Sequence, residues 1–334
     1  MGSSLETSRR VDPDFAVAFA ARAGAGGAIP FAAFVELALY HPVVGYYRRR
    51  QTRVGYGAGT DFFTATTSGP VFGELVCAAC VKLLRGRNPA EHRFVEIGAE
   101  PGAGIVQGVA HPFASAHSIG IGEPIELTGP CIVFSNELFD ARPFRRFRFR
   151  SGAWRELGVR LREDSLEEIE LPLAPASGPP APYLPAETAE GYVIDAPEEA
   201  ADLAASIARQ AWSGLFVACD YGKSWQEIVE ALPFGTARAY FRHSQGNDLL
   251  TRPGQQDLTC HVCWDWLADA LTRHGFEAPQ IERQESFFIH HAEAYLSGAI
   301  AADAAQFTRR KQSLFQLLHG AHLGQKFQVL HALR

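Results

Sequence analysis

The sequence lacks long apolar runs. No stretch approaches the roughly 18 to 20 apolar residues that a membrane-spanning helix requires. The opening segment, MGSSLETSRRVDPDF, also lacks the apolar core of a signal peptide. These absences predict a cytoplasmic protein without membrane association. Residues 1–29 are expected to form a leader, with a helical segment that begins near residue 15 and continues to residue 40.

An excess of positive charge is also missing. The chain has 31 Lys and Arg against 37 Asp and Glu, so its formal net charge is -6. This balance gives no support to a nucleic-acid partner. What the sequence does contain is ample apolar material, because 47% of its 334 residues are hydrophobic. That composition is typical of a globular protein with a substantial buried core.

Cysteine is scarce, but its spacing requires a decision about metal. Four of the six cysteines form two C-x-x-C pairs, Cys77 with Cys80 and Cys260 with Cys263. A zinc ribbon usually brings its two pairs within about 15 to 20 residues, whereas these pairs lie far apart and inside apolar segments. We therefore expect small buried thiols and no metal site.

Three apolar stretches each end abruptly in polar residues. They are RFVEIG (93–98), PCIVFSNELFD (130–140) and SGLFVACDYG (213–222). With helical segments between them, such as residues 72–86 and 264–275, they predict an α/β protein with a parallel sheet and ligand-binding groups at the carboxyl ends of the strands. SFFIHH (286–291) could add a strand, and the tail from Glu293 is expected to be largely helical.

Residues 145–161 alternate with period two around Ser151 and Gly152, which predicts a β-hairpin. Its residues Arg146, Arg148 and Arg150 share one face. That face fits a solvated edge strand, or else a contact for an acidic partner. A proline-rich stretch, residues 171–188, then predicts a stiff linker.

The first of the three strands leads into a glycine-rich loop, GAEPGAG (98–104), before an expected helix over residues 104–113. At such a junction glycines let backbone N–H groups approach a ligand closely, and the helix N-terminus favours a carboxylate or phosphate. Alone, the loop is weak evidence for a cofactor site.

Support for a cofactor site becomes stronger with eight stretches, which follow one another in chain order: FVELALYHPVVGYY, GTDFFTATTSGPVFGEL, VEIGAEPG, SNELFDARPF, CDYG, FGTARAYFRH, RPGQQDLTCHV and LGQKFQVL. Together they resemble the MidA-like family of S-adenosylmethionine-dependent methyltransferases. That family includes a mitochondrial complex I assembly factor that methylates an arginine. The resemblance extends from about Pro30 to the C-terminus.

The resemblance implies a class I methyltransferase Rossmann-like sheet that binds S-adenosylmethionine across its strand ends and methylates a protein arginine. It predicts a single domain over residues 30–334, with a core at about 72–140 and 190–334 and a substrate-side insertion at about 141–189. The alternative is a catalytically degenerate binding or assembly protein of the same fold, with weak or no cofactor affinity.

The family's motifs assign roles to individual residues. Its E-x-G-x-G-x-G motif falls on Glu96, Gly98, Glu100 and Gly102, its N-E-x-x-D-A-x-P block on Asn136, Glu137, Asp140, Ala141 and Pro143, and its G-D-F-x-T loop on Asp61, Phe62 and Thr64. Oriented carboxylates bind a guanidinium well, so Glu137 and Asp140 are candidates for engaging the arginine. Asn136 would orient cofactor or substrate, and Asp61 would close the cofactor pocket. His243, Asp257 and His261 rank lower, as structural hydrogen-bonding groups.

The sequence departs from the family in two ways. Glu100 replaces a glycine, which predicts weaker cofactor binding. Residues 105–130 leave room for one helix and one strand near residues 117–122, but not for the family's second helix and third strand. Glu123, with Glu126 behind it, is then the best available acid for the ribose hydroxyls of the cofactor.

Overall fold

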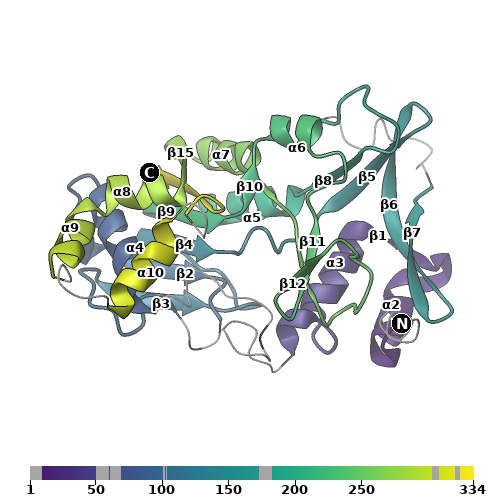
Figure 1. The fold of residues 1–334 in the computed structure, drawn as a ribbon, viewed down its shortest axis with the longest axis horizontal. Helices are drawn as coiled ribbons and strands as arrows, with labels where there is room; N and C mark the ends of the chain where they lie inside the picture. Colours follow the sequence, from purple (N-terminus) through teal and green to yellow (C-terminus); the bar gives the residue numbers. More distant parts are fainter. Residues whose placement is uncertain are drawn as a thin grey trace. The chain divides into compact units, whose positions relative to one another are not determined.

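The computed structural model describes residues 10–49, 60, 69–100, 102, 104–172, 183–302, 308–319 and 324–334 (Figure 1). The chain divides into two compact units that alternate along the sequence. Unit 1 contains Met1–Phe62, Asp140–Ala200 and Lys223–Cys263, and unit 2 contains Phe63–Phe139, Ala201–Gly222 and Trp264–Arg334. Residues 141–189, expected as an insertion, thus belong to unit 1. No helix in the described ranges is long and apolar enough to cross a membrane.

Unit 2 is built on a six-stranded sheet. In spatial order its strands are β15 (Glu277–Arg283), β16 (Gln328–Leu333), β9 (Trp212–Asp220), β4 (Gly129–Asn136), β2 (Arg93–Ile97) and β3 (Ser115–Ile119). The last four strands of this order are parallel to one another, while β16 is antiparallel to both of its neighbours. This is the predicted α/β sheet, and the three predicted strands occupy its centre.

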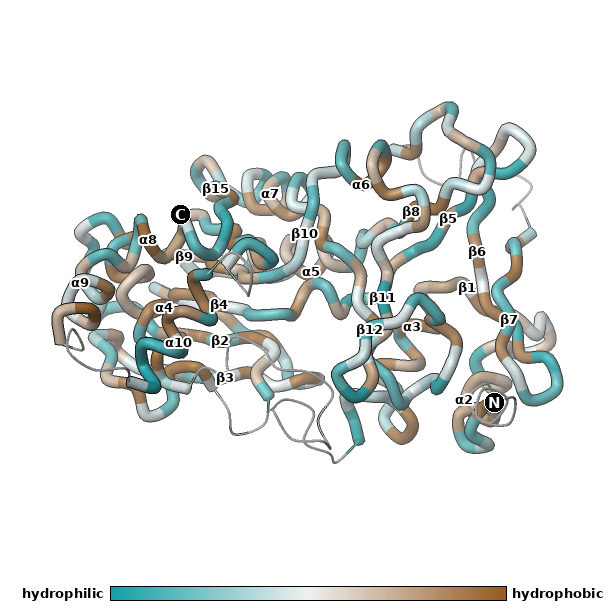
Figure 2. Tube along the Cα trace, in the orientation of Figure 1, coloured by the Kyte–Doolittle hydropathy of each residue, from teal (hydrophilic) through white to brown (hydrophobic). Residues whose placement is uncertain are grey.

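Helices cover both faces of this sheet. One group is α4 (Pro70–Leu83), α8 (Gln284–His291), α9 (Glu293–Ala302) and α10 (Arg309–Leu318). Their buried side chains share one core with the sheet, in which Phe72 packs against Phe134 and Phe288. Helix α7 (Trp264–Arg273) packs against β15 and β16. Figure 2 shows α4 and the central strands among the hydrophobic parts of the chain.

Two expected elements of unit 2 are wrong. Residues 105–108 form a turn where a helix was expected, because Gly108, at φ 73°, and Pro112 interrupt a helix there. Residues 286–291 belong to helix α8 rather than to a strand, since Phe287 and Phe288 are both buried against the core. The predicted strand near residues 117–122 is present as β3, two residues earlier.

Unit 1 contains the helices α2 (Pro13–Ala23), α3 (Phe31–Tyr40) and α6 (Trp225–Ala231). Its larger sheet is ordered β1 (Ala28–Pro30), β6 (Ala153–Arg162), β5 (Arg145–Arg150) and β8 (Val193–Ala196), with β7 (Ser165–Glu170) also paired to β6. Its smaller sheet is ordered β12 (Ser244–Gly246), β11 (Arg238–Phe241) and β13 (Asp257–Thr259). Across both units, the remaining elements of the described residues are α5 (Glu198–Ala208), β10 (Gly222–Lys223), β14 (Val262–Cys263) and 3-10 turns at Gly24–Gly26, Tyr46–Arg48 and Pro89–Glu91.

The predicted hairpin is confirmed as β5 and β6, which turn at Ser151 and Gly152, both with positive φ. The expectation of a solvated edge strand is wrong, because β5 lies between β6 and β8. Its arginines form ion pairs within unit 1: Arg146 with Glu168 and Asp195, Arg148 with Glu168, and Arg150 with Glu170.

Candidate functional site

The carboxyl ends of the three central strands of unit 2 are neighbours, as predicted. Ile97, the last residue of β2, lies opposite Ser135 of β4, and Asn136 lies opposite Cys219 of β9. The polar residues that follow these strands therefore start from one edge of the sheet, the edge at which open parallel sheets bind ligands.

Glu96 of β2 holds the glycine loop through a hydrogen bond. Its side chain is only 4% exposed, and its Oε2 accepts a hydrogen bond from the backbone N–H of Ile105 at 2.8 Å. Burial raises the pKa of this carboxyl to about 7, although the hydrogen bond from Ile105 opposes the shift. Glu96 thus fixes the far end of the loop to the strand that begins it.

At Gly98 and Gly104 the loop approaches its surroundings too closely for a larger residue. At Gly98, with φ 85°, an added Cβ would lie 2.8 Å from Cδ1 of Leu138. At Gly104 it would lie 2.4 Å from Oγ of Ser118. Glu100 is half-buried and is not among the residues of the described chain with positive φ. The backbone strain that a glutamate could bring to this loop is therefore absent.

No helix follows the loop in the described part of residues 104–114. Instead, two turn hydrogen bonds hold this segment, from Gln107 N to Gly104 O at 2.9 Å and from Val109 N to Val106 O at 3.1 Å. The anion-favouring helix N-terminus that we expected beside the loop is thus missing. Close backbone approach remains as the loop's means of holding a ligand.

The end of β4 presents an oriented carboxylate. Glu137 has φ 51°, a left-handed conformation that is strained for a glutamate, and its N–H donates to Cys219 O at 3.0 Å. Nδ2 of Asn136 donates to its Oε1 at 2.9 Å. The buried Oδ1 of Asn136 has no hydrogen-bond donor among the residues that the structure describes. It can therefore accept a hydrogen bond from a bound group.

Two other acids at this edge have structural partners. Asp220, fully buried, accepts the N–H groups of Phe139 at 2.9 Å and Tyr221 at 2.8 Å, and so fixes the turns that follow β4 and β9. Oε2 of Glu123 accepts the N–H of Gly120 at 2.8 Å, within its own turn, and Glu126 is exposed. A role for Glu123 on a ribose stays a prediction.

Of the other motif residues, Asp140 belongs to unit 1. Asp61, Phe62 and Thr64 lie outside the described residues. The buried Asp140 accepts the N–H of Cys260 through its backbone carbonyl at 2.8 Å. Its contribution to a catalytic site stays a prediction.

Sequence reasoning missed two tyrosines of unit 1. Tyr40 donates to the carbonyl of Ala141 at 2.9 Å, and Tyr47 donates to Oδ1 of Asp257 at 2.9 Å. Their rings stack with centroids 5.5 Å apart. Burial, reinforced by the charge of Asp257, raises the pKa of both phenols well above the ordinary value, so both stay protonated donors. The signal was their place in the resembling block FVELALYHPVVGYY.

The two lower-ranked histidines also lie in unit 1. Nε2 of His243 is 3.2 Å from Oγ1 of Thr60. Burial lowers the pKa of His261 to about 4, so its imidazole is neutral at pH 7. All six cysteines are buried free thiols, as expected.

The residues at the strand ends of unit 2 fit S-adenosylmethionine. Gly98 and Gly104 make a close cradle that a Cβ would fill, and the free acceptor of Asn136 suits the cofactor's ammonium group.

Comparisons with known proteins indicate the class of protein. A family model described as "putative S-adenosyl-L-methionine-dependent methyltransferase" matches residues 120–281. The mitochondrial protein arginine methyltransferase NDUFAF7 of Rattus norvegicus is 27% identical over 143 residues, a match that covers 42% of this chain but only 31% of that protein. The Bos taurus protein of the same name is 22% identical over 369 residues, covering 91% of this chain and 80% of that protein.

Solved structures share the fold. One is the crystal structure of a protein from Burkholderia thailandensis, described as a "likely methyl transferase" and bound to S-adenosyl-homocysteine. It has a TM-score of 0.81 and 24% identity and covers 97% of this chain and 94% of that chain. A native crystal structure of a superfamily protein from the same organism has a TM-score of 0.78 at 23% identity, with the same coverage.

Fold and sequence together define an S-adenosylmethionine-dependent methyltransferase with a Rossmann-like sheet. Within this class, the chain is similar to the MidA-like family.

Proposed function

We propose that this protein methylates an arginine of a protein substrate. The mitochondrial relatives named as protein arginine methyltransferases support this choice of acceptor. The observation that carries the proposal is the carboxylate of Glu137, which is held on a strained backbone at the end of β4. Such strain is typical of functional positions, because about 1 to 3 kcal/mol must be offset elsewhere in the fold.

Glu137 binds and orients the guanidinium of the substrate. Asn136 fixes one carboxylate oxygen by donating to Oε1. A positioned carboxylate pairs with a guanidinium through short charge-assisted hydrogen bonds, so a nitrogen of the arginine is aimed and does not rotate freely. The same carboxylate stabilises the positive charge of the methylated guanidinium and accepts the proton that it then releases.

The cofactor's residues lie along the same sheet edge. Backbone groups of Gly98 and Gly104 would hold S-adenosylmethionine, and Oδ1 of Asn136 would accept a hydrogen bond from its ammonium group, while Glu96 ties Ile105 to the end of β2. When bound, the cofactor supplies an electrophilic methyl group on a sulfonium.

The test compares wild type, Glu137→Gln and the control Glu293→Gln, which alters an exposed acid of α9. Extract from cells that lack the protein provides unmethylated acceptors, and labelled methyl incorporation is measured together with mass spectrometry of arginine. We expect Glu137→Gln to lose about 100-fold or more of the transfer rate, while its thermal midpoint and its calorimetric affinity for S-adenosylmethionine stay close to those of wild type. The control should retain full activity. Equal rates in all three proteins would remove Glu137 from the reaction.

A second candidate is a binding or assembly protein of the same fold. It is favoured because the described sheet has no strand beyond β3, where the family has a further strand near the adenine of the cofactor. Cofactor binding without methylarginine in any acceptor would support this alternative.

A further inference from the structure

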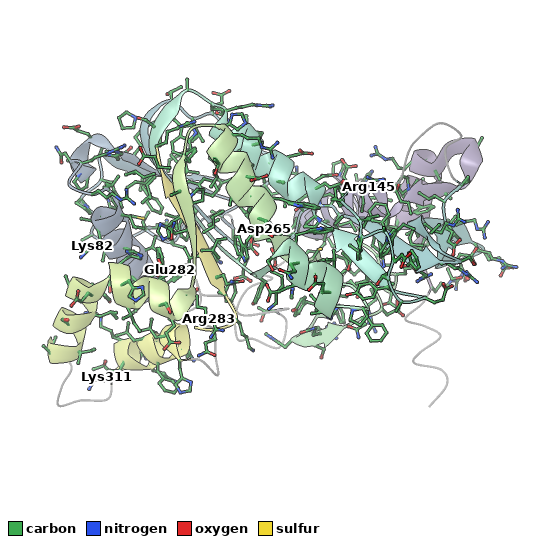
Figure 3. The ribbon with its side chains drawn as sticks, turned by 90° about the horizontal axis from the view of Figure 1, so that it is seen from above. Lys82, Arg145, Asp265, Glu282, Arg283 and Lys311 are labelled. Atoms are coloured by element: carbon green, nitrogen blue, oxygen red, sulfur yellow. The ribbon has the colours of Figure 1, made fainter. Side chains whose placement is uncertain are left out.

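Three histidines of unit 2 surround one carboxylate away from the strand ends described above. Glu282 lies 2.7 Å from Nδ1 of His290, 2.7 Å from Nε2 of His291 and 3.0 Å from Nε2 of His331. The ligand atoms of Glu282, His290 and His291 all lie within 4.8 Å of one another. Figure 3 shows Glu282 beside the C-terminal helices. We call these four residues the histidine cluster.

The fold brings the cluster together from three elements. Gln280 of β15 lies opposite His331 of β16, so Glu282, two residues further along β15, is the diagonal neighbour of His331 on the same face of the sheet. His290 and His291 end helix α8 and reach the same carboxylate from the helix side. Four side chains of metal-binding types thus converge although they are distant in sequence.

Hydrogen bonding alone does not require this set. One carboxylate with two oxygens faces three imidazole nitrogens, and a single histidine would be enough to tie α8 to β15. The cluster also lies at the C-terminus of α8, where the helix dipole and the last carbonyl groups favour a cation. Three imidazole nitrogens, one carboxylate and a negative helix end all suit a divalent metal ion.

We propose that the histidine cluster binds one divalent transition-metal ion, with Zn²⁺ as the best match. Zinc takes four nitrogen, sulfur or oxygen ligands in a tetrahedron at about 2.0 to 2.2 Å, which places neighbouring ligand atoms roughly 3.3 Å apart. The distances from Glu282 open by about 0.3 to 0.6 Å to reach this spacing, and His331, which lies outside the group of atoms within 4.8 Å of one another, moves toward the other two histidines. Each imidazole then carries its proton on the other ring nitrogen.

The exposures of the ligands suggest how the ion enters. The side chains of His331, Glu282 and His291 are 8%, 21% and 19% exposed, whereas that of His290 is 60% exposed. Three ligands therefore form a largely buried half-site, and His290 closes it from the solvent side.

The ion's role is structural. Glu282 pairs with Val329, Val329 with Cys219, and Cys219 with Asn136. Three interstrand spacings of about 4.8 Å therefore separate Glu282 from Asn136, a distance of roughly 14 Å. That separation keeps the ion away from the reacting groups. Four protein ligands also leave no open position for catalysis. The ion would clamp α8 to β15 and β16.

The experiment uses untagged full-length protein freed of metal with a chelator. Calorimetric titration with Zn²⁺, and visible absorption after adding Co²⁺, report stoichiometry and geometry. We expect one ion per chain, a tetrahedral cobalt spectrum and a higher thermal midpoint with zinc. His291→Ala and His290→Gln should each weaken zinc affinity by at least the roughly 10 to 100-fold typical of residues around metal sites.

His117→Gln is the matched control, because His117 is exposed on β3 of the same sheet and outside the cluster. It should bind zinc as wild type does. His290 is largely exposed, so its variant tests the site even if His291→Ala does not fold. Zinc binding that is absent in wild type, or that survives in His290→Gln with the wild-type affinity and spectrum, would overturn the proposal. Methyl transfer is not needed for either measurement, so the two proposals can fail separately.

Discussion

At the scale of single residues, the buried carboxyl of Glu96 makes stability depend on pH. Its pKa is about 7 in the folded protein, against 4.5 as the ordinary value. The folded state therefore binds more protons than the unfolded state between these values, and the contribution of Glu96 to the free energy of unfolding falls as pH rises from about 4.5 through 7. The full shift corresponds to about 3 kcal/mol.

Glu96→Gln should remove this dependence. Urea unfolding at pH 5 and pH 8 would show wild type losing stability relative to the variant on going to pH 8, because glutamine carries no charge to bury. The variant keeps a side-chain oxygen for the N–H of Ile105. A wild-type minus variant difference that is the same at both pH values would contradict the assignment.

Glu100 should weaken S-adenosylmethionine binding through its charge alone. The carboxylate of Glu100 and the carboxylate of S-adenosylmethionine, about 4 Å apart at an effective dielectric near 20, would repel each other by roughly 4 kcal/mol. Partial exposure to solvent reduces this repulsion several-fold. Calorimetric titration should show about tenfold tighter binding in Glu100→Gly. Glu100→Gln should recover most of that gain, because no backbone strain is released at this position. Tighter binding by wild type than by either variant would instead mean that Glu100 pairs with the cofactor's ammonium group.

Residue types and motif spacing predicted which side chains follow the central strands, but not what each one contacts. Glu96, Asn136 and Glu137 start from the expected sheet edge. The strained φ of Glu137 depends on a bond to Cys219, a residue distant in sequence. The histidine cluster was missed for the same reason, since only the pairing of β15 with β16 brings His331 to Glu282. The doublet His290–His291 was its only local signal.

At the scale of elements, the sheet of unit 1 contains a buried ion pair. Asp195 is fully buried and accepts from Nη1 of Arg146 at 2.5 Å and from the N–H groups of Thr236 and Ala237 at 2.7 and 2.8 Å. Asp195→Ala removes one of the two carboxylates that offset the charge of the largely buried Arg146 guanidinium. We expect a loss of about 3 to 5 kcal/mol in chemical unfolding.

Arg150→Ala is the control for this prediction. Arg150 pairs with Glu170 in the same sheet, but its side chain is 63% exposed. Its loss should change stability by about 1 kcal/mol or less. Equal effects of the two substitutions would show that burial does not decide the strength of these pairs.

Elements with a clear local pattern were predictable. The central strands are continuous apolar runs, and the hairpin has a two-residue turn at Ser151 and Gly152. The segment 286–291 has no such pattern, because its phenylalanines and isoleucine suit either a strand or a buried helix. Packing of Phe288 against Phe72 of α4 decided for the helix, and that contact spans the sequence.

At the scale of the whole molecule, the family resemblance predicted the sheet. The short span of residues 105–130 predicted that the family's third strand would be absent from it. Beyond β3 the described sheet has no further strand, as the short span before Cys131 required. The alternation of two units along the chain was not predictable, because it depends on which distant segments pack together. The interior position of β16 was also missed, since the tail was expected to be largely helical.

Removal of residues 328–334 should abolish folding of unit 2. Strand β16 lies between β15 and β9, and it buries Val329 and Leu330 fully. Its loss would unpair both neighbouring strands and open the core. Circular dichroism and solubility of the truncated chain test this, with the full chain as the control. A cooperative unfolding transition in the chain truncated after Phe327 would contradict it.

The position of β16 also has a consequence for biosynthesis. A ribosome makes β9 more than a hundred residues before β16, at roughly 5 to 20 residues per second. For several seconds or longer, therefore, the nascent chain presents β9 with an unpaired edge and an apolar surface. Unpaired edges of this kind recruit other strands and lead to aggregation. Slow translation or limited chaperone capacity should accordingly lower the yield of this protein more than a change in its final stability would.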